Sequence, residues 1–155
     1  MTSEIEVAWA AGFFDGEGCV SAKRAGRRYN LMIAVTQIDL RPLLKMRRLF
    51  GGFICAHPAR KEGWAKWYQW VASACQAAQA LKAMLPYLMV KREVAELGLA
   101  LQRSKRSPGH HIAQCEADQQ RWYAEAIKAQ NALRPDQDEA GLPAKPTSSQ
   151  LRLVI

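Results

Sequence analysis

The segment EIEVAWAAGFF, residues 4–14, constrains the fold of this chain more than any other. Ser3 and Glu6 form the S-x-x-E pattern that typically begins a helix. Apolar residues then recur at helical spacing on one side and also fill a second side: Ile5, Ala8, Trp9, Gly12 and Phe13 on the first, and Val7, Ala10, Ala11 and Phe14 on the second. A helix that is apolar almost all round must be buried on two sides. Its own domain can cover one side, and the small residues Ala8, Ala11 and Gly12 would let a second partner approach the other closely.

The charge of the chain is unevenly distributed. Its 155 residues suit one domain and carry a formal net charge of +8, with a sequence pI of about 9.6. The net charge is +3 over residues 1–50, +6 over 51–110 and −1 over 111–155. This excess indicates a polyanionic partner for the first two-thirds of the chain, with nucleic acid ahead of an anionic membrane. The sequence has no long apolar run and starts with the charged SEIE, so we expect an intracellular protein without a membrane partner.

The four cysteines do not form a recognisable metal or disulfide pattern. Cys19, Cys55, Cys75 and Cys115 include no C-x-x-C pair, and no histidine stands at zinc-finger spacing. We therefore expect four reduced thiols, with Cys75 buried in its apolar helical surroundings.

The order of predicted elements is αββαββα followed by further helices. The expected helices span 4–14, 40–50, 75–85, 91–103 and 112–133, with Asp39 as the N-cap of the second, and the expected strands span 19–24, 29–37, 53–57 and 66–73. This order predicts an α+β domain over residues 1–134, with a saddle-shaped antiparallel sheet covered by helices on one face. Residues 135–155, rich in Pro, Ser and Asp, predict a flexible C-terminal tail.

Three short stretches resemble a known family. AAGFFDGEG, from Ala10 to Gly18, resembles the nine-residue LAGLIDADG motif of homing endonucleases. VTQ, with Arg41 four residues after Gln37, resembles the strand end that carries a pocket Gln and Arg in homodimeric members. PYLMVK, ending at Lys91, resembles the segment whose lysine reaches the active site. The resemblance covers about residues 3–105, and a single motif copy is typical of the homodimeric branch.

The resemblance implies a catalytic role for Glu17, Gln37, Arg41 and Lys91. Glu17, where Asp is commoner, would bind the catalytic metal with the backbone carbonyl of Gly16; the ion would be Mg²⁺, or another divalent cation such as Mn²⁺, or Ca²⁺ in a non-cleaving complex. Gln37 and Lys91 would surround the attacking water, and Arg41 would stabilise charge unless Pro42 re-aims it. Asp15 has two open interpretations: a supporting acid of the site, or a purely structural hydrogen-bond or charge partner.

The uncovered face of the sheet would be the DNA-binding surface. Alternation and the turns assign to it Ser21, Lys23, Arg24, Arg27, Arg28, Asn30, Met32, Cys55, His57, Lys66, Tyr68 and Trp70, with Arg60 and Lys61 in the second loop. Trp67 and Val71 would then face the core. Met32, Cys55 and Trp70 suit contacts to thymine methyl groups, or else indicate a register error of one residue. For the cations the alternative is a merely solvated charged face.

The implied function is site-specific cleavage of double-stranded DNA by a homodimer, on both strands of a long, near-palindromic site. The dimer would form through the motif helix at Ala8, Ala11 and Gly12. Such enzymes are usually encoded in mobile introns or inteins, which would place this one in a prokaryotic cytoplasm or nucleoid, or in an organelle matrix. Two alternatives stay open: a non-cleaving nucleic-acid binder on the same fold, either an intron RNA maturase or a transcriptional regulator, and a basic α+β protein that binds another anion.

Overall fold

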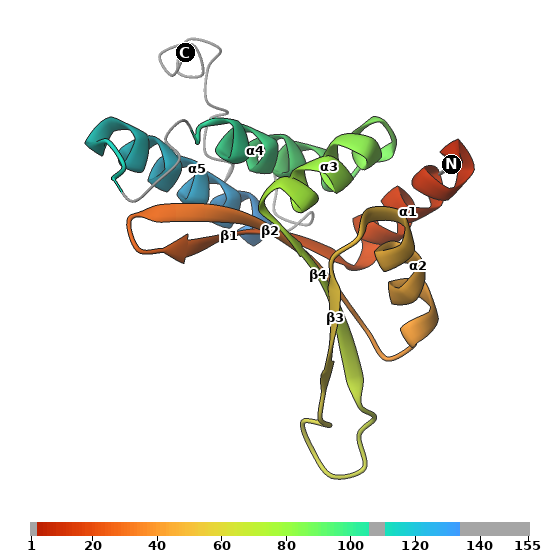
Figure 1. Cartoon of the computed structure of the whole chain (residues 1–155). Helices are drawn as coiled ribbons and strands as arrows, with labels where there is room; N and C mark the ends of the chain where they lie inside the picture. Colours follow the sequence, from red (N-terminus) through yellow and green to blue (C-terminus); the bar gives the residue numbers. More distant parts are fainter. Residues whose placement is uncertain (1–2, 106–110, 134–155) are drawn as a thin grey trace.

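The computed structural model of the chain describes residues 3–105 and 111–133 (Figure 1). Within these ranges the elements are α1 Glu4–Glu17, β1 Gly18–Ala25, β2 Arg28–Gln37, α2 Leu40–Phe50, β3 Phe53–His57, β4 Trp67–Ser73, α3 Ala74–Met84, the 3₁₀ turn η1 Leu85–Tyr87, α4 Arg92–Arg103 and α5 Gln114–Ala132. This order confirms the predicted αββαββα arrangement with additional C-terminal helices. The predicted tail, 135–155, lies outside the described residues.

Helix α1 is longer than the sequence suggested. Its start is as expected, because Ser3 Oγ accepts a hydrogen bond from the backbone N–H of Glu6 at 3.2 Å. The helix does not stop at Phe14 but continues through Gly16 to Glu17. Gly18 then begins β1 so close to the helix that an added Cβ would lie 2.4 Å from the Phe14 ring and 2.5 Å from its carbonyl oxygen. A glycine at position 18 is therefore needed for the helix to pass directly into the strand.

The described strands form one antiparallel sheet in the order β1-β2-β4-β3. The sheet is strongly twisted, so the β1–β2 hairpin and the β3–β4 hairpin extend in different directions, and the latter projects away from the helices (Figure 1). All the described helices pack on one side, which leaves the other face of the sheet open. This is the α+β architecture that the sequence predicted.

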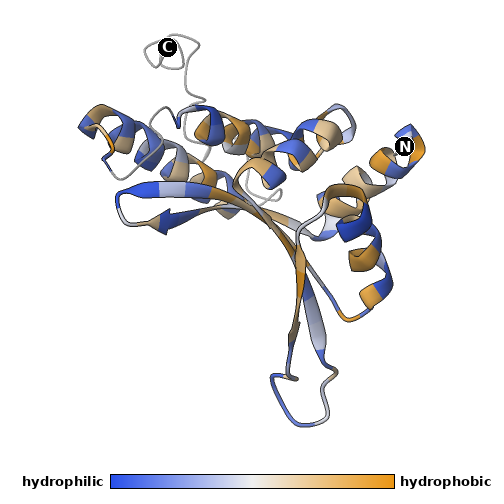
Figure 2. Cartoon of the chain, viewed as in Figure 1, coloured by the Kyte–Doolittle hydropathy of each residue, from blue (hydrophilic) through white to orange (hydrophobic). Residues whose placement is uncertain are grey.

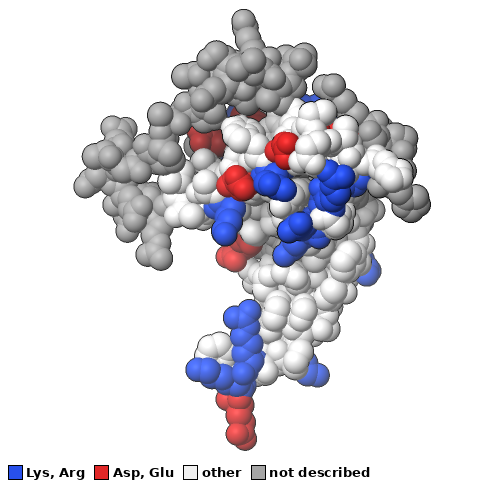
Figure 3. Space-filling view, turned by 90° about the vertical axis from the view of Figure 1, so that its left-hand side faces the viewer, with Lys and Arg blue, Asp and Glu red and all other residues white. Residues whose placement is uncertain are grey.

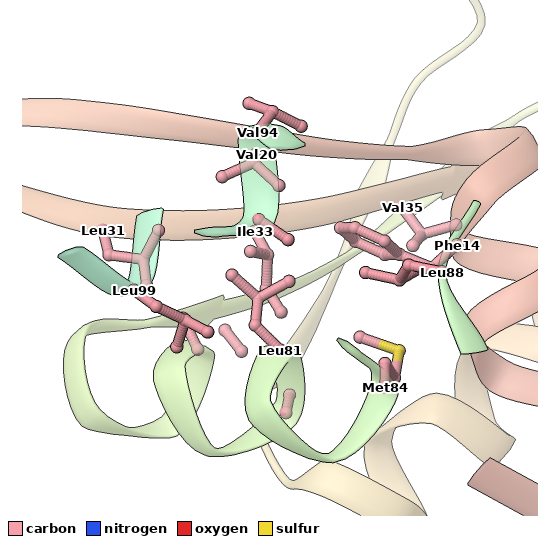
Figure 4. Packing of buried hydrophobic residues seen from close by; sticks show 14 of the residues in the cluster. Phe14, Val20, Leu31, Ile33, Val35, Leu81, Met84, Leu88, Val94 and Leu99 are labelled. Carbon is pink, nitrogen blue, oxygen red and sulfur yellow. The ribbon is translucent and has the colours of Figure 1, made fainter. Parts of the chain in front are cut away.

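The core lies between the helices and the covered face of the sheet. Val20, Leu31, Ile33 and Val35 point from β1 and β2 toward α3 and α4, where they meet a set of buried apolar residues that includes Leu81, Met84, Val94 and Leu99 (Figure 4). Apolar residues gather on the sheet-facing sides of these helices and hydrophilic ones on their outer sides (Figure 2). Helix α4 comes especially close at Gly98, where an added Cβ would lie 2.8 Å from Leu31 Cδ1. The core thus holds α4, which follows Lys91, at a fixed height above the sheet.

The register of β4 corrects one prediction. Trp70 pairs with Val35, which is buried, and is itself 0% exposed; its indole N–H donates to the Gly51 carbonyl at 2.8 Å. Tyr68 shares this covered face and packs against the core. The open face of β4 instead carries Trp67, Gln69 and Val71. The sequence prediction was wrong by one residue because β4 has large aromatic side chains on both faces, so alternation alone does not distinguish them.

Two further observations concern the whole described region. All four cysteines are free, and Cys75 is exposed in the first turn of α3 rather than buried. No helix in the described ranges is both long and apolar enough to cross a membrane.

Candidate active site and nucleic-acid interface

The C-terminal end of α1 presents an unpaired carboxylate. Glu17 is the last residue of the helix, and both it and Gly16 are exposed. Glu17 makes no hydrogen bond or ion pair with any residue that the structure describes. An exposed carboxylate without a partner keeps all its oxygen lone pairs available for a cation or a water molecule.

Asp15, two residues earlier, has a structural role. Its carboxylate accepts hydrogen bonds from the backbone N–H groups of Met89 at 2.7 Å, Val90 at 3.3 Å and Lys91 at 2.9 Å. These three residues lie just before α4, so their N–H groups have no hydrogen-bond partner within the helix. The Asp15 carboxylate provides that partner. The contacts support the interpretation of Asp15 as a hydrogen-bond partner that holds the fold, rather than as an acid of the site. The same contacts hold the segment before α4 against the end of α1.

Lys91 is brought to the candidate site by this anchor. Its side-chain Nζ donates a hydrogen bond to the backbone carbonyl of Asp15, and the residue is half-buried. A cation is therefore fixed at the last turn of α1, two residues from Glu17, although 74 positions separate Lys91 and Glu17 in the sequence.

Gln37 reaches the same end of the sheet through the strand register. Gly18 pairs with Val35, so the chain enters β1 beside the point where β2 ends at Gln37. Gln37 pairs on its other side with Tyr68 and is half-buried. Glu17, Lys91 and Gln37 thus lie at the same end of the sheet.

Arg41, near the start of α2, is paired with a neighbouring carboxylate. Its guanidinium is bound to Asp39, with Nε 3.0 Å from both carboxylate oxygens and Nη2 2.5 Å from Oδ2. The hydrogen bonds from Arg41 lower the pKa of Asp39 to about 2, and the pairing raises the pKa of Arg41. The Arg41 side chain is otherwise 89% exposed. Sequence reasoning recognised Asp39 as the N-cap of α2 but missed its pairing with Arg41, which the Asp-x-Arg spacing could have suggested.

The donor set at this site fits a divalent cation only in part. A carboxylate and a backbone carbonyl are the oxygen ligands that Mg²⁺ accepts. In the described residues, however, no group of three or more His, Cys, Asp or Glu side chains could hold a metal ion. The described side chains of one chain therefore do not complete a metal site, and further ligands would have to come from phosphate oxygens, water or a second chain.

The open face of β1 and β2 carries Ser21, Lys23, Arg28, Asn30 and Met32, as the sequence predicted. Ser21 is paired with Met32, Lys23 with Asn30 and Ala25 with Arg28, opposite to the buried face of Val20 and Leu31. Arg24, which the sequence placed in the turn, instead lies within β1 and pairs with Tyr29 on the alternation of the covered face, because β1 continues to Ala25. Cys55 and His57 lie on the same open face of β3. Lys66 is exposed just before β4, while Tyr68 and Trp70 belong to the covered face as described above.

Lys and Arg residues gather in two places on this side of the molecule (Figure 3). In the sequence, Lys23, Arg24, Arg27 and Arg28 belong to the β1–β2 hairpin, and Arg60, Lys61 and Lys66 to the β3–β4 hairpin. Between them, the row of paired residues Cys19, Ala34, Val71 and Phe53 carries no charge. Two cationic ends with an uncharged middle suit a long polyanion that crosses the sheet.

Several of these side chains are already held in place. Lys105 Nζ donates to Asn30 Oδ1, and burial, followed by the nearby charge of Arg28, lowers the pKa of Lys105. At the turn, Arg27 donates to Gln114 and Arg24 to the Gly26 carbonyl. These contacts orient the cations, and Lys105 was not among the residues predicted from the sequence.

An aromatic stack lies on the open face of the second hairpin. The rings of His57 and Trp67 are 3.9 Å apart at an angle of 11°, and the Arg60 guanidinium lies 5.0 Å from the Trp67 ring. His57 Nε2 and Trp67 Nε1 are shielded from solvent and have no hydrogen-bond partner in the described part of the chain. Trp67, which the sequence assigned to the core, is therefore a residue of the candidate interface.

The outer side of α1 is an apolar stripe. Ile5 is 82% exposed, and Trp9 and Gly12 are exposed one and two turns further along the same side, with Ala8 half-buried beside them. An added Cβ at Gly12 would meet no atom within 4 Å. Ala11, in contrast, is 0% exposed and belongs to the core, so the prediction that it lies on the outer surface was wrong.

Comparisons with known proteins identify the fold. No family model matches the sequence, and no curated protein matches it. Among solved structures, the archaeal intron-encoded homing endonuclease I-Vdi141I in complex with DNA superposes with a TM-score of 0.67 at 15% identity, over 97% of this chain and 95% of that chain. The homing endonuclease I-CvuI in complex with its target gives 0.66 at 19% identity, with the same coverage. The homing endonuclease I-TnaI gives 0.55 at 17% identity, over 81% of this chain and 95% of that chain. The chain therefore has the fold of the homing endonucleases, and the stretch that resembles the LAGLIDADG motif lies at the junction of α1 and β1.

Proposed function

We propose that the protein is a site-specific DNA endonuclease that acts as a homodimer with a divalent metal ion, preferably Mg²⁺. The observation that carries the proposal is the unpaired, exposed carboxylate of Glu17, with Lys91 and Gln37 at the same end of a sheet whose open face is basic. The I-Vdi141I and I-CvuI structures contain DNA, and the latter was solved with calcium, which supports the same substrate and ion class here.

The geometry suggests a role for each residue. Glu17 and the Gly16 carbonyl would hold the ion, which supplies Lewis-acid stabilisation of a phosphate and lowers the pKa of a bound water. The Gln37 amide would orient the attacking water, because an amide can both donate to and accept from it. Lys91, fixed through Asp15, would stabilise the negative charge that develops on the phosphate.

A homodimer explains the outer side of α1. Two copies of the stripe formed by Ile5, Ala8, Trp9 and Gly12 could pack together, since the small residues allow the helix backbones to approach. Met89 and Val90, held at the end of α1 by Asp15, are 87% and 78% exposed and would extend the same apolar surface. In such a dimer, two Glu17 carboxylates would lie near the two-fold axis, one for each DNA strand.

Each sheet would bind one half of a near-palindromic site. The cationic ends would contact phosphates, and the side chains between them would contact base edges in the major groove. A substrate of this kind places the activity where DNA is present, in a prokaryotic cytoplasm or nucleoid or in an organelle matrix, and is consistent with an enzyme encoded by a mobile intron.

The test begins with a target selected by the protein from a randomised pool of DNA duplexes. With Mg²⁺ we expect the native chain to cut both strands of the selected duplex, and Glu17→Gln to bind it but not cut it. Glu96→Gln is the matched control, because it removes the same charge from an exposed pair with Arg92 on α4. Undiminished cleavage by Glu17→Gln would contradict the metal-binding role. Binding without cleavage by the native chain, in either Mg²⁺ or Mn²⁺, would instead indicate a non-cleaving nucleic-acid binder.

A further inference from the structure

The carboxylate of Asp39 makes two different kinds of contact. One is the N-cap of α2, in which Oδ1 accepts the backbone N–H of Arg41 at 2.9 Å. The other is the pairing with the Arg41 guanidinium through Nε and Nη2. A cap alone needs only one oxygen, and Ser or Asn would serve equally well at this position. The second contact therefore has a consequence beyond the start of the helix.

That consequence is orientation rather than stability. An ion pair between exposed side chains contributes little to folding, and the side chains of Arg41 and Asp39 are 89% and 43% exposed. A guanidinium has five N–H donors in a rigid plane, and Asp39 engages only the Nε and Nη2 side of it. The Nη1 side keeps its donors, pointing in a direction that the carboxylate fixes.

The pair also lies near the candidate active site. Asp39 follows Gln37 by two residues, at the end of the sheet where α1 passes into β1. Because Asp39 cancels the charge of Arg41, the guanidinium adds little to the general attraction between the protein and DNA. It can still donate hydrogen bonds to a phosphate oxygen as negative charge increases there.

We propose that Asp39 is a positioning residue for Arg41: it holds the guanidinium so that its free edge meets a DNA phosphate, and it limits the contribution of Arg41 to non-specific binding. The proposal rests on the endonuclease function proposed above. It predicts opposite effects of losing the Asp39 charge, namely tighter non-specific binding and slower cleavage. A purely structural cap predicts neither effect.

The experiment uses Asp39→Asn and Asp39→Ser, which both keep an N-cap, each in the native chain and in an Arg41→Ala chain. On the selected duplex, we expect kcat to fall about tenfold in the native background with an unchanged or lower KM, since misorienting a donor costs at least that much. In the Arg41→Ala background, the Asp39 variants should cause no further loss. Glu96→Gln should leave both constants unchanged.

A second measurement does not depend on cleavage. On a non-specific duplex, we expect the slope of log K against log salt to steepen by about 0.9 in the Asp39 variants, because one more cation contacts a phosphate. This change should vanish in the Arg41→Ala background. An unchanged slope overturns the positioning proposal, as does a cleavage loss that persists without Arg41. If the native chain cuts no DNA, the proposed endonuclease function fails, and the slope alone decides the role of Asp39.

Discussion

Asp15 and Lys91 are hydrogen-bonded to each other twice, although 76 positions separate them. The Asp15 carboxylate accepts the backbone N–H of Lys91 at 2.9 Å, and Lys91 Nζ donates to the Asp15 backbone carbonyl. This reciprocal contact joins the last turn of α1 to the start of α4. It makes the position of the candidate catalytic lysine depend on the first acid of the motif.

Replacing Asp15 should therefore affect both stability and cleavage. Asp15→Ala leaves three backbone N–H groups without their acceptor, and we expect the free energy of unfolding to fall by about 2 kcal/mol. Cleavage should fall as well, because Lys91 loses its anchor, while Asp15→Asn should be milder in both respects. Urea unfolding and single-turnover cleavage measure the two effects.

Asp118→Ala is the control. Asp118 accepts one hydrogen bond from Gln114 on the surface of α5, so its removal should change stability and cleavage little. Equal effects of Asp15→Ala and Asp118→Ala would contradict the anchor.

Gly12 tests the proposed dimer without disturbing the fold of one chain. Its surroundings are open, so Gly12→Leu adds bulk to the surface of α1 and removes an unfavourable helical glycine. We expect the variant to elute as a monomer in size-exclusion chromatography with light scattering, and to lose cleavage of both strands. Ala83→Leu, at an exposed position of α3, should keep the native mass. A native chain that is itself monomeric at micromolar concentration would argue against the dimer.

The two glycines at the end of the motif should respond oppositely to alanine. At Gly18, a Cβ would collide with the Phe14 ring and carbonyl, so Gly18→Ala should lower the free energy of unfolding by about 2 kcal/mol. At Gly16, an added Cβ would meet no atom within 4 Å, and the residue is helical. Gly16→Ala should therefore raise the free energy of unfolding by up to about 1 kcal/mol. Denaturant midpoints of the two variants, compared side by side, check this contrast. Similar destabilisation by both would show that α1 ends before Gly16.

The register of β4 predicts which tryptophan supports the fold. Trp70→Phe removes a buried indole and its hydrogen bond to Gly51, and should cost about 2 kcal/mol of unfolding free energy. Trp67 lies on the open face, so Trp67→Phe should lower the free energy of unfolding by less than about 0.5 kcal/mol. Thermal unfolding distinguishes the two variants, and the reverse order would indicate that Trp67 is the core residue.

The pairing of Asp39 with Arg41 has a defined pH range. Hydrogen bonds from Arg41 lower the pKa of Asp39 from 3.8 to about 2. The small stabilisation of the folded state by this pairing is therefore complete above about pH 4, and it is lost as the pH falls toward 2. The pair is thus intact throughout the range in which cleavage would be assayed. In a carbon NMR titration, the Asp39 carboxyl should have its midpoint near 2 and move up toward its ordinary value in Arg41→Ala. An unshifted midpoint in the native chain would contradict the pairing.

The sequence predicted those features that depend on local pattern. The S-x-x-E start of α1, the Asp39 cap and the order of strands and helices all follow from spacing and turn residues. The apolar character of α1 on both sides also predicted correctly that one side would remain uncovered within a single chain. These properties need no knowledge of long-range contacts.

Features that depend on packing were harder to predict. Ala8 and Ala11 are the same residue type in the same helix, and only the position of the neighbouring elements decides that Ala11 is buried. In β4, Trp67 and Trp70 are equally plausible core residues by hydropathy, and the pairing with β2 decides between them. The Asp-x-Arg spacing allows the pairing of Arg41 with Asp39 but does not establish it, because an exposed arginine has many rotamers of similar energy.

The projecting β3–β4 hairpin has a consequence for how such a protein can evolve. Its outer part, with Arg60, Lys61, Trp64 and Lys66, is exposed and lies beyond the helices, whereas Asp15, Gly18 and Trp70 hold the fold and the site together elsewhere. Substitutions in this outer part can accumulate without a compensating change in the interior. A lineage of such proteins could therefore change the surface of this hairpin freely while its interior stays constant.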